Sequence, residues 1–132
     1  MKEATVGYKK ILAVDDEAHM LRLMEYNLSR EGYTVITAGS GREAIEMAHL
    51  ERPDLVLLDI RMPHMNGHEV FARLKGHPNT TSIPVIFISS VSDDEEKIRF
   101  EAHKIQKPFS SSVLIDKVRS VLVEMNAGEK GQ

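Results

Sequence analysis

Short apolar runs alternate with amphipathic stretches along most of this chain. The runs are rich in Leu, Ile and Val, and they cover residues 10–14, 33–38, 55–58 and 84–88. Runs of this length and composition predict strands that are buried on both faces of a sheet. Residues 104–106 lie between two longer stretches and have room only for a short fifth strand.

The first two stretches between the strands predict helices. The first helix should bury one side, made of Met20, Leu21, Leu23, Met24 and Leu28. Gly32 follows as a helix stop. The second should begin with a capping box from Ser40 to Glu43 and end before Pro53. It should run through the apolar residues Ala44, Ile45, Met47, Ala48 and Leu50.

Three further helices are predicted. Asn66 is an N-cap candidate with Glu69 three residues on, and Gly76 follows the last apolar residue of that helix. Another capping box, Ser92 to Glu95, predicts a helix that continues to Ala102. The last helix should be capped by Ser110 and should turn inward Val113, Leu114, Val118, Val121 and Leu122.

The alternation of strands and helices predicts the α/β fold class. A strand–helix unit repeated five times, (βα)5, favours one five-stranded parallel sheet with helices on both faces and right-handed crossovers. The 132 residues are enough for one domain and too few for two. We expect an N-terminal extension over residues 1–8, a single domain over residues 9–125 and a flexible C-terminal tail over residues 126–132.

Composition narrows the classes of function. Lys and Arg number 17 against 20 Asp and Glu, so no basic surplus favours nucleic acid. The absence of Cys excludes disulfides and thiolate metal sites and is compatible with the cytoplasm. The N-terminus lacks the apolar segment of a signal peptide, and no run approaches the roughly 20 residues of a membrane span. A cytoplasmic protein that does not contact a membrane is expected.

Polar residues follow the predicted strands where each strand ends. Asp15 and Asp16 follow the first, Asp59 the third, Ser89 the fourth and Lys107 the fifth. In parallel sheets the ligand site lies beyond the carboxyl ends of the strands, so these side chains should meet in one crevice. Adjacent carboxylates repel one another unless a cation lies among them, and Mg²⁺ prefers such oxygen ligands. A carboxylate can also attack phosphorus and form an aspartyl phosphate.

Specific motifs accompany this arrangement. Asp15-Asp16, the run Asp59-Ile-Arg-Met-Pro-His-Met-Asn-Gly67, Ser89 and Lys107-Pro108-Phe109 resemble the receiver domains of response regulators. The similarity extends from about Lys9 to Met125. It implies a flavodoxin-like architecture and a place in a two-component phosphorelay.

The resemblance also implies roles for individual residues. Asp59 would be the phosphoacceptor, and Mg²⁺ would be held by Asp16, Asp59 and the backbone carbonyl of Arg61, with Asp15 acting mainly through water. Ser89 would be the switch hydroxyl and Lys107 the phosphate-binding amine. The Lys107–Pro108 peptide bond would be cis.

The same resemblance implies partners. A sensor histidine kinase or a phosphotransfer protein would supply the phosphoryl group, and an unknown effector would respond to it. The domain would not bind nucleic acid directly, and a homodimer is possible. It would catalyse only its own phosphorylation and dephosphorylation. The chain resembles either a stand-alone regulator or a receiver excised from a longer one.

Several features of the sequence are also compatible with other functions. Gly39-Ser-Gly41-Arg-Glu-Ala44 imitates a dinucleotide fingerprint, but it follows the second strand and is better explained as a tight turn before a capped helix. His64 and His68 have i, i+4 spacing without a third ligand, so surface histidines are favoured over zinc. Haloacid-dehalogenase-like phosphatases also use an Asp nucleophile, but they need a second Asp where this chain has Arg61. A pure interaction module would not need the acidic pocket.

Three departures from the family affect the expected switch. Ser90 replaces the usual Ala after the switch hydroxyl, and the interval from Ser89 to Lys107 is shorter than usual. Lys104 stands where the family has an aromatic residue on the fifth strand. We expect Lys104 to stay at the surface, with no aromatic rotamer switch at this position. The face built from the fourth helix, the fifth strand and the last helix should differ from the family's common one.

Overall fold

The computed structural model describes residues 9–90 and 103–130, with the backbone alone for residues 126–130. Its strands are β1 (Lys10–Val14), β2 (Thr34–Ala38), β3 (Leu55–Asp59), β4 (Val85–Ser89) and β5 (Lys104–Gln106). Its helices are α2 (Ala18–Ser29), α3 (Gly41–Glu51), α4 (Gly67–Lys75) and α6 (Ser111–Lys130). The helix expected from Ser92 to Ala102, with Phe100, lies outside the described residues.

The strands form one parallel sheet, which confirms the predicted α/β class. Their order is β2-β1-β3-β4-β5, and each neighbouring pair is parallel. The direction in which the chain crosses the sheet reverses between β1 and β3, which are direct neighbours. In such sheets a crevice opens at the carboxyl ends of the strands on either side of this reversal.

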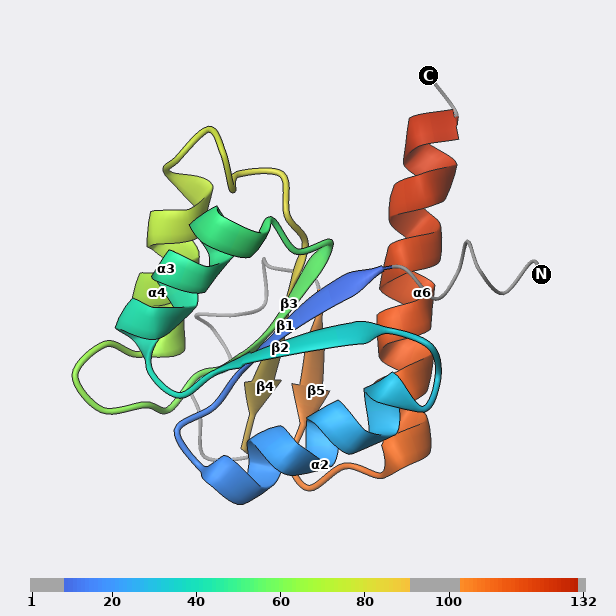
Figure 1. Ribbon diagram of the computed structural model, residues 1–132, viewed down its shortest axis with the longest axis horizontal. Helices are drawn as coiled ribbons and strands as arrows, with labels where there is room; N and C mark the ends of the chain where they lie inside the picture. Colours follow the sequence, from blue (N-terminus) through green and yellow to red (C-terminus); the bar gives the residue numbers. More distant parts are fainter. Residues whose placement is uncertain (1–8, 91–102, 131–132) are drawn as a thin grey trace.

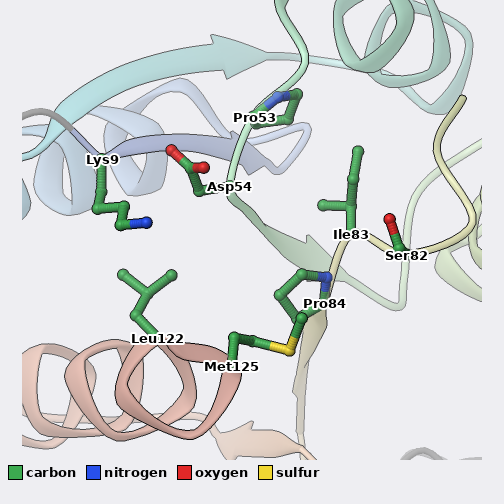
Figure 2. A pocket seen from close by; sticks show the side chains of 8 residues that line it. All are labelled: Lys9, Pro53, Asp54, Ser82, Ile83, Pro84, Leu122 and Met125. Carbon is green, nitrogen blue, oxygen red and sulfur yellow. The ribbon is translucent and has the colours of Figure 1, made fainter. Parts of the chain in front are cut away.

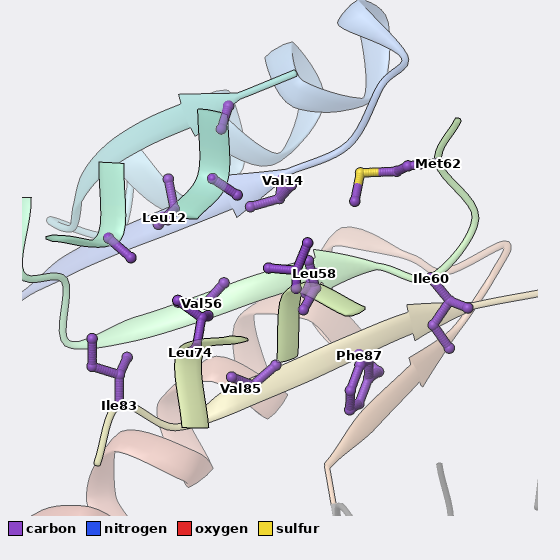
Figure 3. Close-up of a cluster of buried hydrophobic side chains, with 14 residues drawn as sticks. Leu12, Val14, Val56, Leu58, Ile60, Met62, Leu74, Ile83, Val85 and Phe87 are labelled. Atoms are coloured by element: carbon purple, nitrogen blue, oxygen red, sulfur yellow. The ribbon is translucent and has the colours of Figure 1, made fainter. Parts of the chain in front are cut away.

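Helices cover both faces of the sheet (Figure 1). Alternate strand residues point to opposite faces, so the sheet supplies two core clusters. One cluster joins Leu12, Val56, Leu58 and Phe87 to α3 and α4, as Figure 3 shows for the strand side. The other joins Ile11, Leu57 and Ile86 to α2 and α6. This packing on both sides holds the strand ends in fixed positions.

The ends of the helices largely follow the sequence signals. Asn66 and Glu69 form the predicted capping box of α4. Gly32 has a φ of 98° in the turn after α2, a conformation that glycine adopts without strain. Ser40 accepts a hydrogen bond from the Glu43 backbone N–H, but the Glu43 carboxylate accepts from Gly39 and not from Ser40. Of the capping box predicted from Ser40 to Glu43, only the hydrogen bond to the Ser40 side chain is therefore present.

Two apolar residues that were expected to lie on the buried side of their helices are exposed. Leu23 is 45% exposed and Val113 49%. Leu23 and Val113 each directly precede a buried residue, and successive helical residues point about 100° apart. The backbone of residues 126–130 is helical within α6, and the flexibility expected of the tail stays a prediction. No helix in the described segments is long and apolar enough to cross a bilayer.

The fifth strand bears on the expected switch. Lys104 lies opposite Phe87 in the β4–β5 register and is exposed, as predicted. On the same face of the sheet, the ring of Phe87 contacts His68 and Phe71 of α4 at centroid distances of 5.6 and 5.2 Å. Aromatic packing in this region thus comes from β4 and α4. The shape of the face beside the undescribed residues 91–102 stays a prediction.

Candidate functional site

The carboxyl edge of the sheet brings the predicted site residues together. Asp15 follows β1 directly and is fully buried, while Asp16 beside it is exposed. Asp59 is the last residue of β3 and is only 4% exposed. Ser89 is the last residue of β4, and Lys107 follows β5. The strand-end rule therefore places acids, hydroxyl and amine at one edge.

The three acids form a compact oxygen cluster. One carboxylate oxygen from each of Asp15, Asp16 and Asp59 lies within 4.8 Å of the others. The backbone N–H of Glu17 donates to Asp15 Oδ1 at 2.9 Å, which fixes that carboxylate. Hard oxygen donors at this spacing suit a divalent cation such as Mg²⁺.

Lys107 places a positive charge next to the cluster. Its Nζ lies 3.2 Å from Asp59 Oδ1 and 3.5 Å from Asp15 Oδ2. Its backbone N–H donates to the Ser89 carbonyl at 2.7 Å, and the following peptide bond to Pro108 is cis, as predicted. One ammonium cannot balance three carboxylates, so the described residues leave room for a further cation.

The electrostatics of the cluster reflect this imbalance. Burial, followed by the nearby charge of Asp15, raises the pKa of Asp59 from 3.8 to about 6, although Lys107 opposes the shift. Burial also raises the pKa of Asp15, against the hydrogen bond from Glu17 and the charge of Lys107. Burial lowers the pKa of Lys107, but the charges of Asp59 and Asp15 outweigh it and the pKa is raised. The ionised carboxylates are thus destabilised by burial and by their mutual repulsion, and a bound cation would reduce that repulsion.

Ser89 is 2% exposed at the end of β4. Its hydroxyl makes no hydrogen bond to any residue in the described part of the chain. A buried hydroxyl without an acceptor is costly, and an oxygen-rich group bound at Asp59 would provide one. Arg61, whose carbonyl is the fourth predicted ligand, follows Ile60, whose N–H donates to the Ile88 carbonyl at 3.1 Å.

Gly67 supports the site in a way that the motif alone does not explain. A Cβ at this position would lie 2.5 Å from the Asp59 carbonyl oxygen and 2.9 Å from the Ile60 Cα. Both are backbone atoms, so neither can rotate away. The start of α4 therefore presses directly on the end of β3, and the Gly67 N–H donates to the Ile60 carbonyl at 2.9 Å.

Gly67→Ala is expected to lower the free energy of unfolding by about 1–3 kcal/mol, because an inserted methyl group must displace backbone. Gly39→Ala is the matched control, since a Cβ there meets only Glu43 Oε1, at 3.8 Å. Urea unfolding followed by circular dichroism compares the two. Equal midpoints for the two variants would contradict the close approach.

The competing motifs have structural explanations. A Cβ on Gly41 would lie 2.9 Å from Val70 Cγ2 and 3.0 Å from Met65 Cβ, so this glycine of the dinucleotide-like motif allows α3 to pack against α4. His68 contacts the ring of Phe87, and His64 belongs to the loop with a positive φ of 68°. Neither histidine joins a metal-ligating group among the described residues.

A separate cavity of about 210 Å³ lies at the opposite edge of the sheet. Figure 2 shows Met125 of α6 reaching toward Pro84 and Leu122 of α6 pointing toward Lys9, with Asp54 across the cavity. Asp54 accepts a hydrogen bond from the Lys10 backbone N–H at 2.7 Å. Lys9, Asp54 and Pro84 directly precede β1, β3 and β4, respectively. The cavity therefore lies at the amino ends of the strands, away from the acidic cluster.

Comparisons with known sequences find relatives that match most of the chain. The sequence profile of the response regulator receiver domain matches residues 11–119. Alkaline phosphatase synthesis transcriptional regulatory protein PhoP of Bacillus subtilis is 36% identical over 118 residues, which cover 86% of this chain and 48% of PhoP. Response regulator PleD of Caulobacter vibrioides is 37% identical over 116 residues, 85% of this chain and 26% of PleD. The chain thus spans about half, or less, of these relatives.

Solved structures extend the similarity to three dimensions. Chemotaxis response regulator CheY4 of Vibrio cholerae has a TM-score of 0.79 at 27% identity, covering 86% of this chain and 98% of CheY4. The receiver domain of a signal transduction histidine kinase from Syntrophus aciditrophicus has a TM-score of 0.80 at 32% identity. The match covers 89% of this chain and 92% of that receiver structure. Profile, relatives and fold agree, and the chain belongs to the receiver domains of two-component response regulators.

Proposed function

We propose that this domain accepts a phosphoryl group on Asp59 from a sensor histidine kinase or a phosphotransfer protein, with Mg²⁺, and changes conformation to regulate a partner. The observation that carries the proposal is the position of Lys107 Nζ, 3.2 Å from Asp59 Oδ1, beside acids whose oxygens lie within 4.8 Å of one another. Asp59 is thereby placed with a cationic group that can receive phosphoryl oxygens.

The chemistry requires little more than positioning and charge neutralisation. A carboxylate oxygen of Asp59 attacks the phosphorus atom of the donor and forms a new P–O bond. The bond from phosphorus to the donor's leaving group breaks, and the leaving group departs with the electron pair. Lys107 is placed to bind a phosphoryl oxygen, and the Ser89 hydroxyl is free among the described residues to donate to another.

The residues of the site fit a magnesium ion. Asp16, Asp59 and the Arg61 carbonyl would hold it, with Asp15 acting mainly through water, and the excess of carboxylates over cations supports that assignment. When bound, Mg²⁺ neutralises the negative charge of the phosphoryl oxygens. Lys107, which lies 3.2 Å from Asp59 Oδ1, would add a second positive charge.

We infer that the domain is not a general phosphatase. Arg61 stands two residues after Asp59, where a haloacid-dehalogenase-like enzyme needs an acid for the leaving group. Incubation with acetyl phosphate and Mg²⁺ should give a protein with one phosphate, and incubation with p-nitrophenyl phosphate should give no continuous release of p-nitrophenol. Multiple turnovers of the monoester would contradict this function.

Ser89 and Lys107 should affect the response to phosphorylation more than phosphorylation itself. Each contacts a phosphoryl oxygen only after transfer, so each favours the phosphorylated conformation. Replacing either residue by Ala should lower the coupling free energy between phosphorylation and the conformational change by about 1–3 kcal/mol, while some phosphorylation remains. Amide NMR spectra with and without beryllofluoride measure the response, and Ser82→Ala at the opposite edge is the control. A full response in both site variants would exclude this role.

The partners of the domain follow from this proposal. PhoP is named a transcriptional regulatory protein, but this chain matches only 48% of its length, so that activity is not carried over to this chain. We propose that this chain passes its signal to an effector through protein contact and does not bind nucleic acid itself, in line with its net charge of -3. Action in the cytoplasm, where its phosphodonors would be, is part of the same proposal.

A further inference from the structure

A cleft of about 480 Å³ lies outside the acidic site, between α3 and α4. Residues 40–42 of the β2–α3 turn form one wall, residues 63–65 of the β3–α4 loop form another, and Arg73 of α4 closes it. Figure 1 shows α3 and α4 side by side, with both connecting segments at the same end of the pair. None of the residues assigned to phosphorylation lines this cleft.

The cleft carries two positive charges without partners. Arg42 and Arg73 are exposed, and neither forms an ion pair or hydrogen bond through its side chain with any residue among 9–90 and 103–130. Glu46 and Glu69 lie one helical turn from Arg42 and Arg73, yet they do not pair with them. None of the described residues that line the cleft is acidic. Guanidinium groups keep their charge at all physiological pH values and pair well with carboxylates.

The floor between the two arginines is apolar. Pro63 and Met65 supply it, together with the backbone of Gly41. A Cβ on Gly41 would lie 3.0 Å from Met65 Cβ, so turn and loop are in tight contact beneath the cleft. An apolar floor with a cationic rim is complementary to a peptide that carries an apolar side chain beside carboxylates.

We propose that this cleft binds an acidic, partly apolar segment of a partner protein, with its carboxylates at Arg42 and Arg73 and an apolar side chain over Pro63 and Met65. A nucleic acid is the weaker candidate, because only two arginines are present and the chain has a net charge of -3. A free inorganic anion would leave the apolar floor unused.

Binding at the cleft is linked to the acidic site through one loop. Residues 63–65 lie between Asp59 and α4, and the loop is held by hydrogen bonds from Met65 N–H to the Pro63 carbonyl at 2.7 Å and from Gly67 N–H to the Ile60 carbonyl at 2.9 Å. This part of the inference rests on the proposed function. If phosphorylation of Asp59 shifts the loop, it changes the affinity for the peptide, and by linkage the peptide changes the stability of the phosphorylated state.

The test uses a fluorescein-labelled peptide of alternating Glu and Leu, with a Gln and Leu peptide as its neutral counterpart. Fluorescence polarisation with the full chain, in the absence of metal and phosphodonor, should detect only the acidic peptide. Arg42→Gln and Arg73→Gln should each weaken binding roughly fivefold to tenfold, since each removes a charge-assisted contact. Arg22→Gln, which removes the same charge from α2 on the other face of the sheet, should leave affinity unchanged.

Amide NMR locates the binding, with shifts expected at residues 40–42 and 63–65. No binding, equal binding of both peptides, an equal loss in Arg22→Gln, displacement by inorganic phosphate, or preference for a single-stranded oligonucleotide would each overturn the proposal. Repeating the titration with beryllofluoride and Mg²⁺ tests the linkage. If Asp59 proves unmodified while the peptide still binds at the cleft, the proposed function fails and the cleft stands.

Discussion

Chelation of divalent metal is expected to slow the phosphorylation of this protein by acetyl phosphate at least about a hundredfold, because charge neutralisation at phosphorus contributes several kcal/mol. The acids at the strand ends have their oxygens within 4.8 Å of one another, and the single ammonium of Lys107 cannot balance all three. Without a cation, the incoming phosphoryl group would meet an excess of negative charge.

Variants separate the cation's ligands from general charge effects. Asp16→Ala should lose most of the affinity for Mg²⁺, because Asp16 is the exposed member of the cluster and is open to an incoming ion. Asp116→Asn on α6, whose side chain is 75% exposed, removes the same charge elsewhere and is the control. Titration calorimetry gives the affinities. An undiminished rate of phosphorylation in chelated protein would exclude a metal role.

Asp59→Asn is expected to stabilise the metal-free protein at neutral pH. Burial and the charge of Asp15 raise the pKa of Asp59 from 3.8 to about 6, so the folded state binds this proton more tightly than the unfolded state. Stability contributed by the protonated form is present below about pH 4 and is lost as pH rises toward 6. A shift of about two pH units corresponds to about 3 kcal/mol. The shifted pKa already includes the opposing charge of Lys107, so the ion pair is not subtracted a second time.

We therefore expect a stabilisation of up to about 3 kcal/mol for Asp59→Asn above pH 6, and little difference near pH 4. Urea unfolding at both pH values, in the presence of a chelator, measures it. Added Mg²⁺ should stabilise the wild-type protein more than the variant, because binding to the folded state is linked to its stability. A variant that is less stable than wild type at pH 7 would contradict the cost of burying Asp59.

Local sequence signals predicted much of the fold. The bounds of β1 and β5 follow from short apolar runs and limited space, and the N-cap of α4 follows from Asn66 and Glu69. Exposure of Leu23 and Val113 was missed because apolar character does not reveal where the buried face of a helix ends. The pairing of Glu43 with Gly39 was missed because a capping motif does not specify which N–H its carboxylate will accept from.

The candidate site could be predicted for a different reason. Parallel strands deliver their carboxyl ends to one edge, so Asp15, Asp59 and Lys107 could be grouped from their order alone. The raised pKa of Asp59 could not be predicted from the sequence, because it depends on burial by residues that are distant in the chain. Nor could the cleft, because no local pattern relates Arg42 to Arg73 until α3 packs against α4. The contact of Gly67 with the end of β3 likewise requires the folded loop.

The central claim is that Asp59 is the single phosphoacceptor. Intact-mass measurement after incubation with acetyl phosphate and Mg²⁺ tests it most directly, comparing the wild-type protein, Asp59→Asn and the control Asp116→Asn. We predict the mass of one phosphate on the wild type and on the control, and none on Asp59→Asn. Phosphate that persists on Asp59→Asn, or a wild-type protein that takes up none, would contradict the assignment.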